Sequence, residues 1–76
     1  MPTLKLNSEV TGNVWKVEVA AGQAVAEGDV LVIVESMKME IPIEAPRAGT
    51  VAAIHVAEGE AIKEGALAVE LEVGLA

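Results

Sequence analysis

The sequence contains the same unit twice. Residues 12–35 align with residues 49–72 without a gap when the chain is shifted by 37 positions. The alignment holds ten identical pairs: Gly12/Gly49, Val14/Val51, Val19/Val56, Ala20/Ala57, Gly22/Gly59, Ala24/Ala61, Glu27/Glu64, Gly28/Gly65, Val32/Val69 and Glu35/Glu72. Such a chain uses one structural unit twice, and neither copy is long enough to bury its apolar side alone.

Apolar and polar residues alternate with a period of two inside each copy. Trp15, Val17 and Val19 alternate with Lys16 and Glu18. The second copy repeats the alternation at Ala53, Ile54, His55 and Val56. This period predicts half-buried β-strands, with Trp15 packed inside the fold and His55 on its surface.

Turns separate these strands at short intervals. Gly22 and Gly28 in the first copy, and their mates Gly59 and Gly65, supply residues that accept a positive φ. Val30–Val34 is apolar at every position, which predicts a strand covered on both sides, because five residues between turns are too few for a buried helix.

The composition is consistent with an all-β fold. Aromatic residues make up only 1% of the 76 residues, so the core is built from Val, Ile, Leu and Ala. β-branched residues favour strands. We therefore predict one domain over residues 1–76, a flattened barrel or sandwich with pseudo-two-fold symmetry in which each copy lends a strand to the other.

The charge and the missing residue types exclude several functions. A formal net charge of −7 opposes binding to nucleic acid and to an anionic membrane surface. There is no cysteine, and the single histidine, His55, is too little for a metal centre or a catalytic base. The start of the chain has no signal-peptide pattern, and Val30–Val34 is far shorter than the roughly 20 residues of a membrane span, so we expect a cytoplasmic protein.

The segment between the two copies forms a hairpin of about residues 35–41. One strand ends near Ser36, another begins near Met39, and the chain reverses at Met37 and Lys38 without Gly, Asn, Asp or Pro. Local rules of this kind are broken mostly at functional sites. If the strand pattern reaches the turn, Met37 and Met39 share one side and Lys38 projects from the other. The alternative interpretation is a solvated surface lysine.

The segment Glu35-Ser36-Met37-Lys38-Met39-Glu40, set between two glycine-punctuated β units, resembles the attachment hairpin of the biotinyl domain of biotin-dependent carboxylases. The resemblance covers about residues 4–72. It implies a barrel-sandwich hybrid fold of two four-stranded antiparallel sheets, with biotin joined to Lys38 by a biotin protein ligase. It also implies recognition of the hairpin by its partners, through these residues: Glu35, Ser36, Met37, Met39 and Glu40.

The resemblance further implies a carrier without catalytic activity of its own. Such a carrier shuttles a carboxyl group from a biotin carboxylase to a carboxyltransferase. The chain is most similar to the short, free-standing carriers of this family. The favoured acceptor is an acyl-CoA, as in the acetyl-CoA carboxylase of fatty acid biosynthesis, and urea or a keto acid are the alternatives that the sequence leaves open. In this interpretation Glu35 and Glu40 belong to a recognition surface and are not an acid/base pair.

Two alternatives remain open. Lipoyl domains share the fold and the lysine hairpin, but they commonly have an acidic residue before the lysine and Ala after it, where this chain has Met37 and Met39. Lipoate is therefore the less favoured cofactor, and a protein that takes both cofactors is a related possibility. The second alternative is an unmodified structural or interaction module of the same fold, which would not need Lys38 between two methionines.

Overall fold

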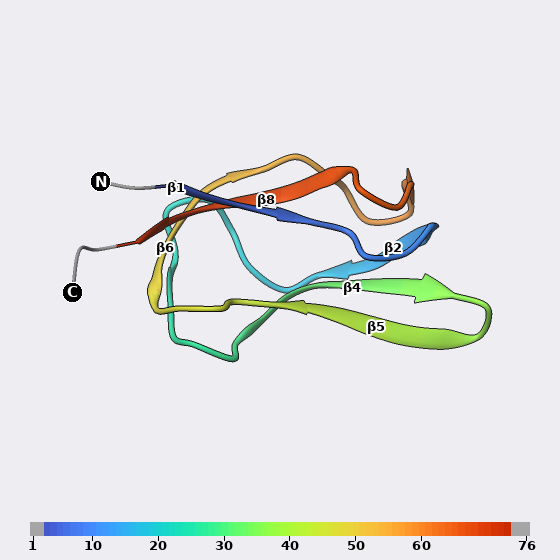
Figure 1. Ribbon diagram of the computed structural model, residues 1–76, viewed down its shortest axis with the longest axis horizontal. Helices are drawn as coiled ribbons and strands as arrows, with labels where there is room; N and C mark the ends of the chain where they lie inside the picture. Colours follow the sequence, from blue (N-terminus) through green and yellow to red (C-terminus); the bar gives the residue numbers. More distant parts are fainter. Residues whose placement is uncertain (1–2, 74–76) are drawn as a thin grey trace.

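The computed structural model describes residues 3–73 as eight β-strands (Figure 1). They are β1 (Thr3–Asn7), β2 (Gly12–Val17), β3 (Ala24–Val25), β4 (Val30–Ser36), β5 (Met39–Glu44), β6 (Gly49–Ile54), β7 (Ala61–Ile62) and β8 (Leu67–Val73). The predicted all-β class is confirmed. Residues 3–73 contain no apolar helix of membrane-spanning length.

The strands form two four-stranded antiparallel sheets. One sheet has the order β1-β8-β6-β3 and the other β5-β4-β2-β7. Strands β2, β3 and β4 become β6, β7 and β8 when shifted by 37 residues, and the same exchange converts one sheet order into the other. The predicted pseudo-two-fold symmetry is confirmed, and each half lends strands to the other: β7 pairs with β2, and β3 pairs with β6.

The core lies between the two sheets and is aliphatic. It contains no aromatic side chain among the described residues, and its members are these: Val14, Val25, Leu31, Val32, Val34, Ala45, Val51, Ile62, Ala68, Val69, Leu71 and Val73. Branched aliphatic side chains suit this position because they pack well against a pleated surface. The long axis of the molecule follows the strands, with overall extents of 38 × 17 × 17 Å.

The predicted inward position of Trp15 is wrong. Val14 pairs with Val34 and Lys16 pairs with Ile33, so Trp15 is an extra residue in the β2–β4 ladder. This bulge interrupts the alternation of side chains, and Trp15 and Lys16 are both exposed on the outer face of the sheet. Inward and outward side chains therefore alternate on each side of Trp15, but the bulge shifts the inward-facing positions by one residue.

A second bulge explains the apolar run Val30–Val34. The β4–β5 pairing jumps from Val30 to Val32, so Leu31 and Val32 are both buried although they are adjacent. Ile33 is only half-buried and is not among the described side chains that pack on the core. The predicted cover on both sides of this strand is therefore wrong at Ile33, which faces outward.

Two glycines allow neighbouring strands of the same sheet to approach closely. A Cβ atom at Gly12 would overlap the carbonyl oxygen of Glu35, and one at Gly49 would overlap that of Glu72. These two contacts are related by the 37-residue repeat. Gly12 thereby holds the start of β2 against the end of β4, directly before the hairpin that carries Lys38.

We predict that Gly12→Ala and Gly49→Ala each lower the free energy of unfolding by about 1–3 kcal/mol. The reason is that a backbone carbonyl must move to make room for the methyl group. Urea denaturation followed by the fluorescence of Trp15 measures the effect. Asn13→Ala, at the exposed neighbouring position, is the control and changes the free energy of unfolding by less than about 0.5 kcal/mol. A wild-type denaturation midpoint for Gly12→Ala would contradict the close approach of β2 to β4 at this position.

Candidate functional site

The β4–β5 hairpin ends in a two-residue turn formed by Met37 and Lys38. Its last strand pair is Ser36 with Met39. Both turn residues have positive φ, 49° at Met37 and 66° at Lys38, and among the described residues they are the only ones other than glycine that do. Left-handed backbone costs roughly 1–2 kcal/mol for an L-residue with a Cβ atom. As predicted, the turn lacks the Gly, Asn or Asp residues that usually occupy positive-φ positions. The rest of the fold offsets the conformational free energy that this costs.

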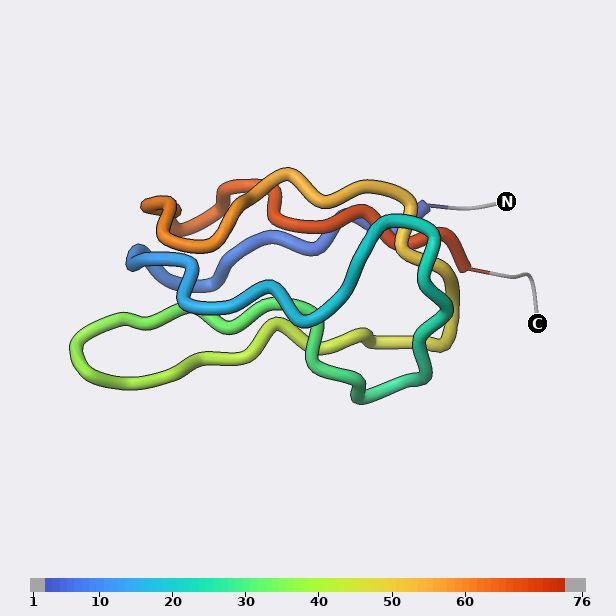
Figure 2. Tube along the Cα trace, turned by 180° about the vertical axis from the view of Figure 1, so that it is seen from behind, coloured from blue at the N-terminus to red at the C-terminus, as the bar shows by residue number. Residues whose placement is uncertain are grey.

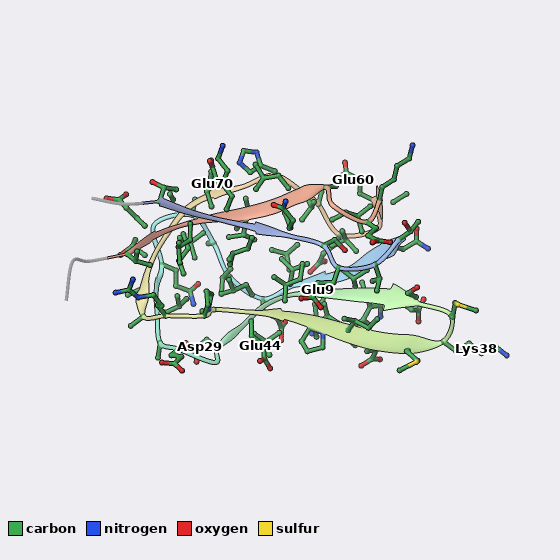
Figure 3. All side chains as sticks on the ribbon, in the orientation of Figure 1. Glu9, Asp29, Lys38, Glu44, Glu60 and Glu70 are labelled. Atoms are coloured by element: carbon green, nitrogen blue, oxygen red, sulfur yellow. The ribbon has the colours of Figure 1, made fainter. Side chains whose placement is uncertain are left out.

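Lys38 lies at the end of the longest axis of the molecule. The hairpin extends beyond the other loops at its end of the body (Figures 1 and 2), and the Lys38 side chain points away from the protein into solvent (Figure 3). No residue in the described range 3–73 makes a hydrogen bond or an ion pair with its ammonium group. The amine is thus accessible from nearly all directions.

Met37 and Met39 are exposed on either side of the lysine in sequence. Their exposed fractions are 93% and 64%, the largest among the described large apolar side chains. The strand geometry stops at Ser36 and resumes at Met39, so strand alternation does not relate the two methionines, and the premise for placing them on one side fails. Exposed thioether side chains are adaptable contact groups, and here they add exposed apolar surface on both sides of Lys38 in the sequence.

Glu35 and Glu40 form the cross-strand pair next to the Ser36–Met39 pair that closes the turn. They are direct partners in the β4–β5 register, and both are exposed. Like charges opposite each other destabilise an antiparallel pair, so this arrangement does not serve the hairpin itself. The two carboxylates and the Lys38 ammonium together make a compact charged tip.

Ser36 anchors the base of the turn. Its Oγ donates a hydrogen bond of 2.9 Å to the carbonyl oxygen of Thr11, in the loop before β2. The Thr11 hydroxyl in turn accepts a hydrogen bond of 2.9 Å from the backbone N–H of Glu64. Thr11 was not predicted from the sequence, because a bond between residues 25 positions apart leaves no local pattern. The Ser36 hydroxyl is thus engaged inside the protein.

Two further residues lie away from this hairpin. His55 is exposed on the other sheet, where its Nε2 is 3.0 Å from a carboxylate oxygen of Glu70, so the predicted surface position is confirmed. Trp15 is exposed on the outer side of β2. No group of His, Asp or Glu in the described range could hold a metal ion.

A groove of about 480 Å³ runs between the edge strands β1 and β5. Leu6, Ile41 and Ile43 line it, and Lys38 does not. The lysine is therefore presented on a convex tip instead of a pocket. A side chain displayed in this way is suited to enter the active site of another protein.

Residues 5–71 match the sequence profile of the biotin/lipoyl attachment family, described as "Biotin-requiring enzyme". The chain belongs to this family. The match spans nearly all of the eight strands and includes the β4–β5 hairpin with Lys38. Domains of this family are carriers.

Two relatives of this biotin/lipoyl attachment domain are of similar size. The "Biotin/lipoyl attachment protein" of Bacillus subtilis is 45% identical over 51 residues, which cover 67% of this chain and 70% of that protein. The "Biotinylated protein TB7.3 homolog" of Mycobacterium leprae is 45% identical over 49 residues, covering 64% of this chain and 69% of that protein.

A solved structure has the same fold within a much larger chain. The crystal structure of the Kluyveromyces lactis urea carboxylase superposes with a TM-score of 0.87 and 34% sequence identity. The superposition covers 93% of this domain but 6% of that chain. The barrel-sandwich hybrid fold expected for a biotinyl domain is thereby confirmed.

We predict that Met37→Asn stabilises the domain by about 0.5–1 kcal/mol, since Asn accepts a positive φ at a turn more readily than Met does. No packing is lost, because Met37 is 93% exposed. Thermal denaturation followed by circular dichroism measures the change. Met39→Asn is the matched control and brings no such gain, because Met39 lies in β5 with a negative φ. An unchanged or lower melting temperature for Met37→Asn would contradict the strain assigned to the turn.

Proposed function

We propose that this domain is a biotin carboxyl carrier and that Lys38 bears the biotin through an amide bond. The observation that carries the proposal is the exposed amine of Lys38 on a left-handed turn between two exposed methionines. Membership of the biotin/lipoyl attachment family supports the cofactor, and so does the relative named as a biotinylated protein.

The hairpin residues prepare Lys38 for acylation. The turn holds the lysine backbone in one conformation, and the Ser36–Thr11 hydrogen bond fixes the base of the hairpin, so an acylating enzyme meets the amine in a constant setting. Formation of the amide removes the positive charge of Lys38. The tip then carries only the carboxylates of Glu35 and Glu40, and partners can distinguish the modified hairpin from the free one by charge.

The carrier role follows from tethering. When bound, biotin supplies the group that accepts and releases a carboxyl group, and the protein supplies position and recognition. A tether raises the effective concentration at a partner's active site to roughly millimolar values. The eight-stranded body keeps this tether on a stiff support.

The proposed partners are a biotin protein ligase, a biotin carboxylase and a carboxyltransferase. The carboxyltransferase selects the acceptor, and we place an acyl-CoA in that role, because a relative from Mycobacterium leprae is named a biotin-dependent acyl-coenzyme A carboxylase subunit. Urea is the alternative acceptor, because a solved structure with the same fold is named a urea carboxylase. These reactions fit a cytoplasmic location and require no catalytic residue in this domain.

Lipoate is the second candidate cofactor. One specific observation favours keeping it, which is the similarity to a protein of Bacillus subtilis named for attachment of both biotin and lipoate. Both cofactors would use the same amine, so the turn geometry at Lys38 does not separate them.

We predict that Lys38→Arg abolishes incorporation of labelled biotin while leaving the fold intact. Arginine keeps the charge and the exposed position but offers no amine that forms the amide. Purified protein is incubated with biotin protein ligase, ATP and labelled biotin, and Lys5→Arg, at an exposed position on the other sheet, is the matched control that retains full labelling. Labelled biotin in the Lys38→Arg variant would exclude Lys38 as the acceptor.

The intact mass of the wild-type protein from its host, with a peptide map, identifies the native cofactor. A biotin-sized increment on Lys38 supports the carrier proposal. A lipoyl-sized increment assigns the second candidate function. No increment in a host that contains the ligase would contradict both and leave an unmodified module.

A further inference from the structure

The outer face of the Lys38-bearing sheet carries an apolar stripe that the fold does not use. Trp15, in the β2 bulge, is 49% exposed. Ile33 on β4 faces outward because its neighbours Val32 and Val34 are buried in the core. Pro42 on β5 is exposed and pairs with Ile33. Trp15, Ile33 and Pro42 thus form one stripe across three neighbouring strands, here called the apolar stripe.

The internal repeat supplies a comparison for this stripe within the same molecule. A shift of 37 residues takes Trp15 to Ala52, Ile33 to Glu70, and Pro42 back to Lys5. These three positions occupy the same places in the other sheet, where Lys5 pairs with Glu70 and Ala52 is the extra residue of the equivalent bulge. At these positions the outer face of that sheet therefore carries one small side chain and two charged ones.

The same backbone thus accepts polar residues at these positions, so the apolar stripe is not a requirement of the fold. Large apolar side chains on a surface gain nothing until another surface covers them. The stripe lies only on the sheet that carries Lys38. This asymmetry between two otherwise equivalent faces points to a partner of the lysine-bearing face.

Carboxylates surround the apolar stripe. Glu35 and Glu40 form the strand pair between the stripe and the turn. Glu44 follows Pro42 by two residues on β5 and projects from the outer face of this sheet, on the side of the molecule opposite Glu70 (Figure 3). Lys16 is the cation at the stripe, and its Nζ lies 6.0 Å from the centre of the Trp15 ring. A complementary partner would have an apolar recess with basic residues along its rim.

The apolar stripe and Lys38 are close enough for one partner protein to contact both. The Ile33–Pro42 pair is three residues along the strands from the Ser36–Met39 pair at the turn. At about 3.3 Å per residue, this separation is about 10 Å. A standard interface buries about 800 Å² on each partner, which corresponds to a disc with a radius of about 16 Å. One partner can therefore cover the stripe and hold Lys38 in its active site.

We propose that the apolar stripe is the docking surface for the enzyme that acylates Lys38. This inference rests on the proposed function. That enzyme acts on the bare amine, so its active site lies within one side-chain length of the turn, and its surface meets the nearby strands. Enzymes that act on the attached cofactor reach it at the end of a long arm, and contact with the strands is not required of them.

The test measures acylation kinetics for Trp15→Ala with purified biotin protein ligase, ATP and labelled biotin. Alanine is the residue that the other half of the chain has at the equivalent position, so the bulge accepts it. We expect KM for the domain to rise about 10- to 30-fold, as for the loss of an aromatic interface anchor, with kcat changed less than about twofold. Trp15→Phe retains most of the affinity.

His55→Ala is the matched control on the other sheet, and it leaves both KM and kcat at wild-type values. Circular dichroism of each variant separates a docking effect from unfolding, because an unfolded domain would lose kcat as well. The KM increase with unchanged kcat is the signature of docking.

Three outcomes would overturn the inference. A wild-type KM for Trp15→Ala would show that the ligase does not contact the stripe. Wild-type acylation combined with poor carboxylation of the biotinylated variant would assign the stripe to the biotin carboxylase instead. An equal KM increase for His55→Ala would indicate a general effect. Absence of labelling in wild-type protein is a different failure, which contradicts the proposed function itself.

Discussion

The rest of the structure depends on two close contacts between neighbouring strands, each at a glycine that has no side chain. Gly12 lies against the carbonyl of Glu35, and Gly49 lies against that of Glu72. Each contact joins two neighbouring strands of one sheet, β2 with β4 and β6 with β8, at the start of one strand and near the end of the other, and the aliphatic core lies between the two sheets. The contact at Gly12 also lies at the base of the lysine hairpin, because Lys38 follows Glu35 by only three positions. The position of the amine is thus set by backbone packing at its base.

The two-fold symmetry also explains why there is a single lysine hairpin. Strands β4 and β5 pair in one sheet as β8 and β1 pair in the other. Only β4 and β5 are consecutive in the chain, so only they are joined by a turn. The tip is therefore the link between the two copies, and its sequence is free of the constraints that the repeat places on residues 12–35 and 49–72. The proposed attachment site, Lys38, lies at the one connection that the symmetry does not duplicate.

Most of the fold could be predicted from the sequence, because the repeat and the period of two are direct consequences of how a small sandwich buries aliphatic residues. The unusual turn at Met37 and Lys38 was predictable for the same reason, since strands on both sides leave two residues for the reversal. The position of Trp15 was not predictable. One inserted residue in a ladder reverses the side on which the following residues lie, and nothing in the local sequence marks it. The Ser36–Thr11 bond escaped prediction because it depends on how the hairpin meets a distant loop.

The long axis of the body has a mechanical consequence. Thr3, at the start of β1, and Val73, at the end of β8, lie at the end of the molecule opposite the Lys38 turn (Figure 1). Any chain joined beyond these residues would leave from the far end of a body 38 Å long. The stiff strands then act as a lever arm: a small rotation about that far end displaces the lysine through an arc many times wider than the motion of the pivot. A domain only 17 Å across could in this way sweep a volume much larger than its own.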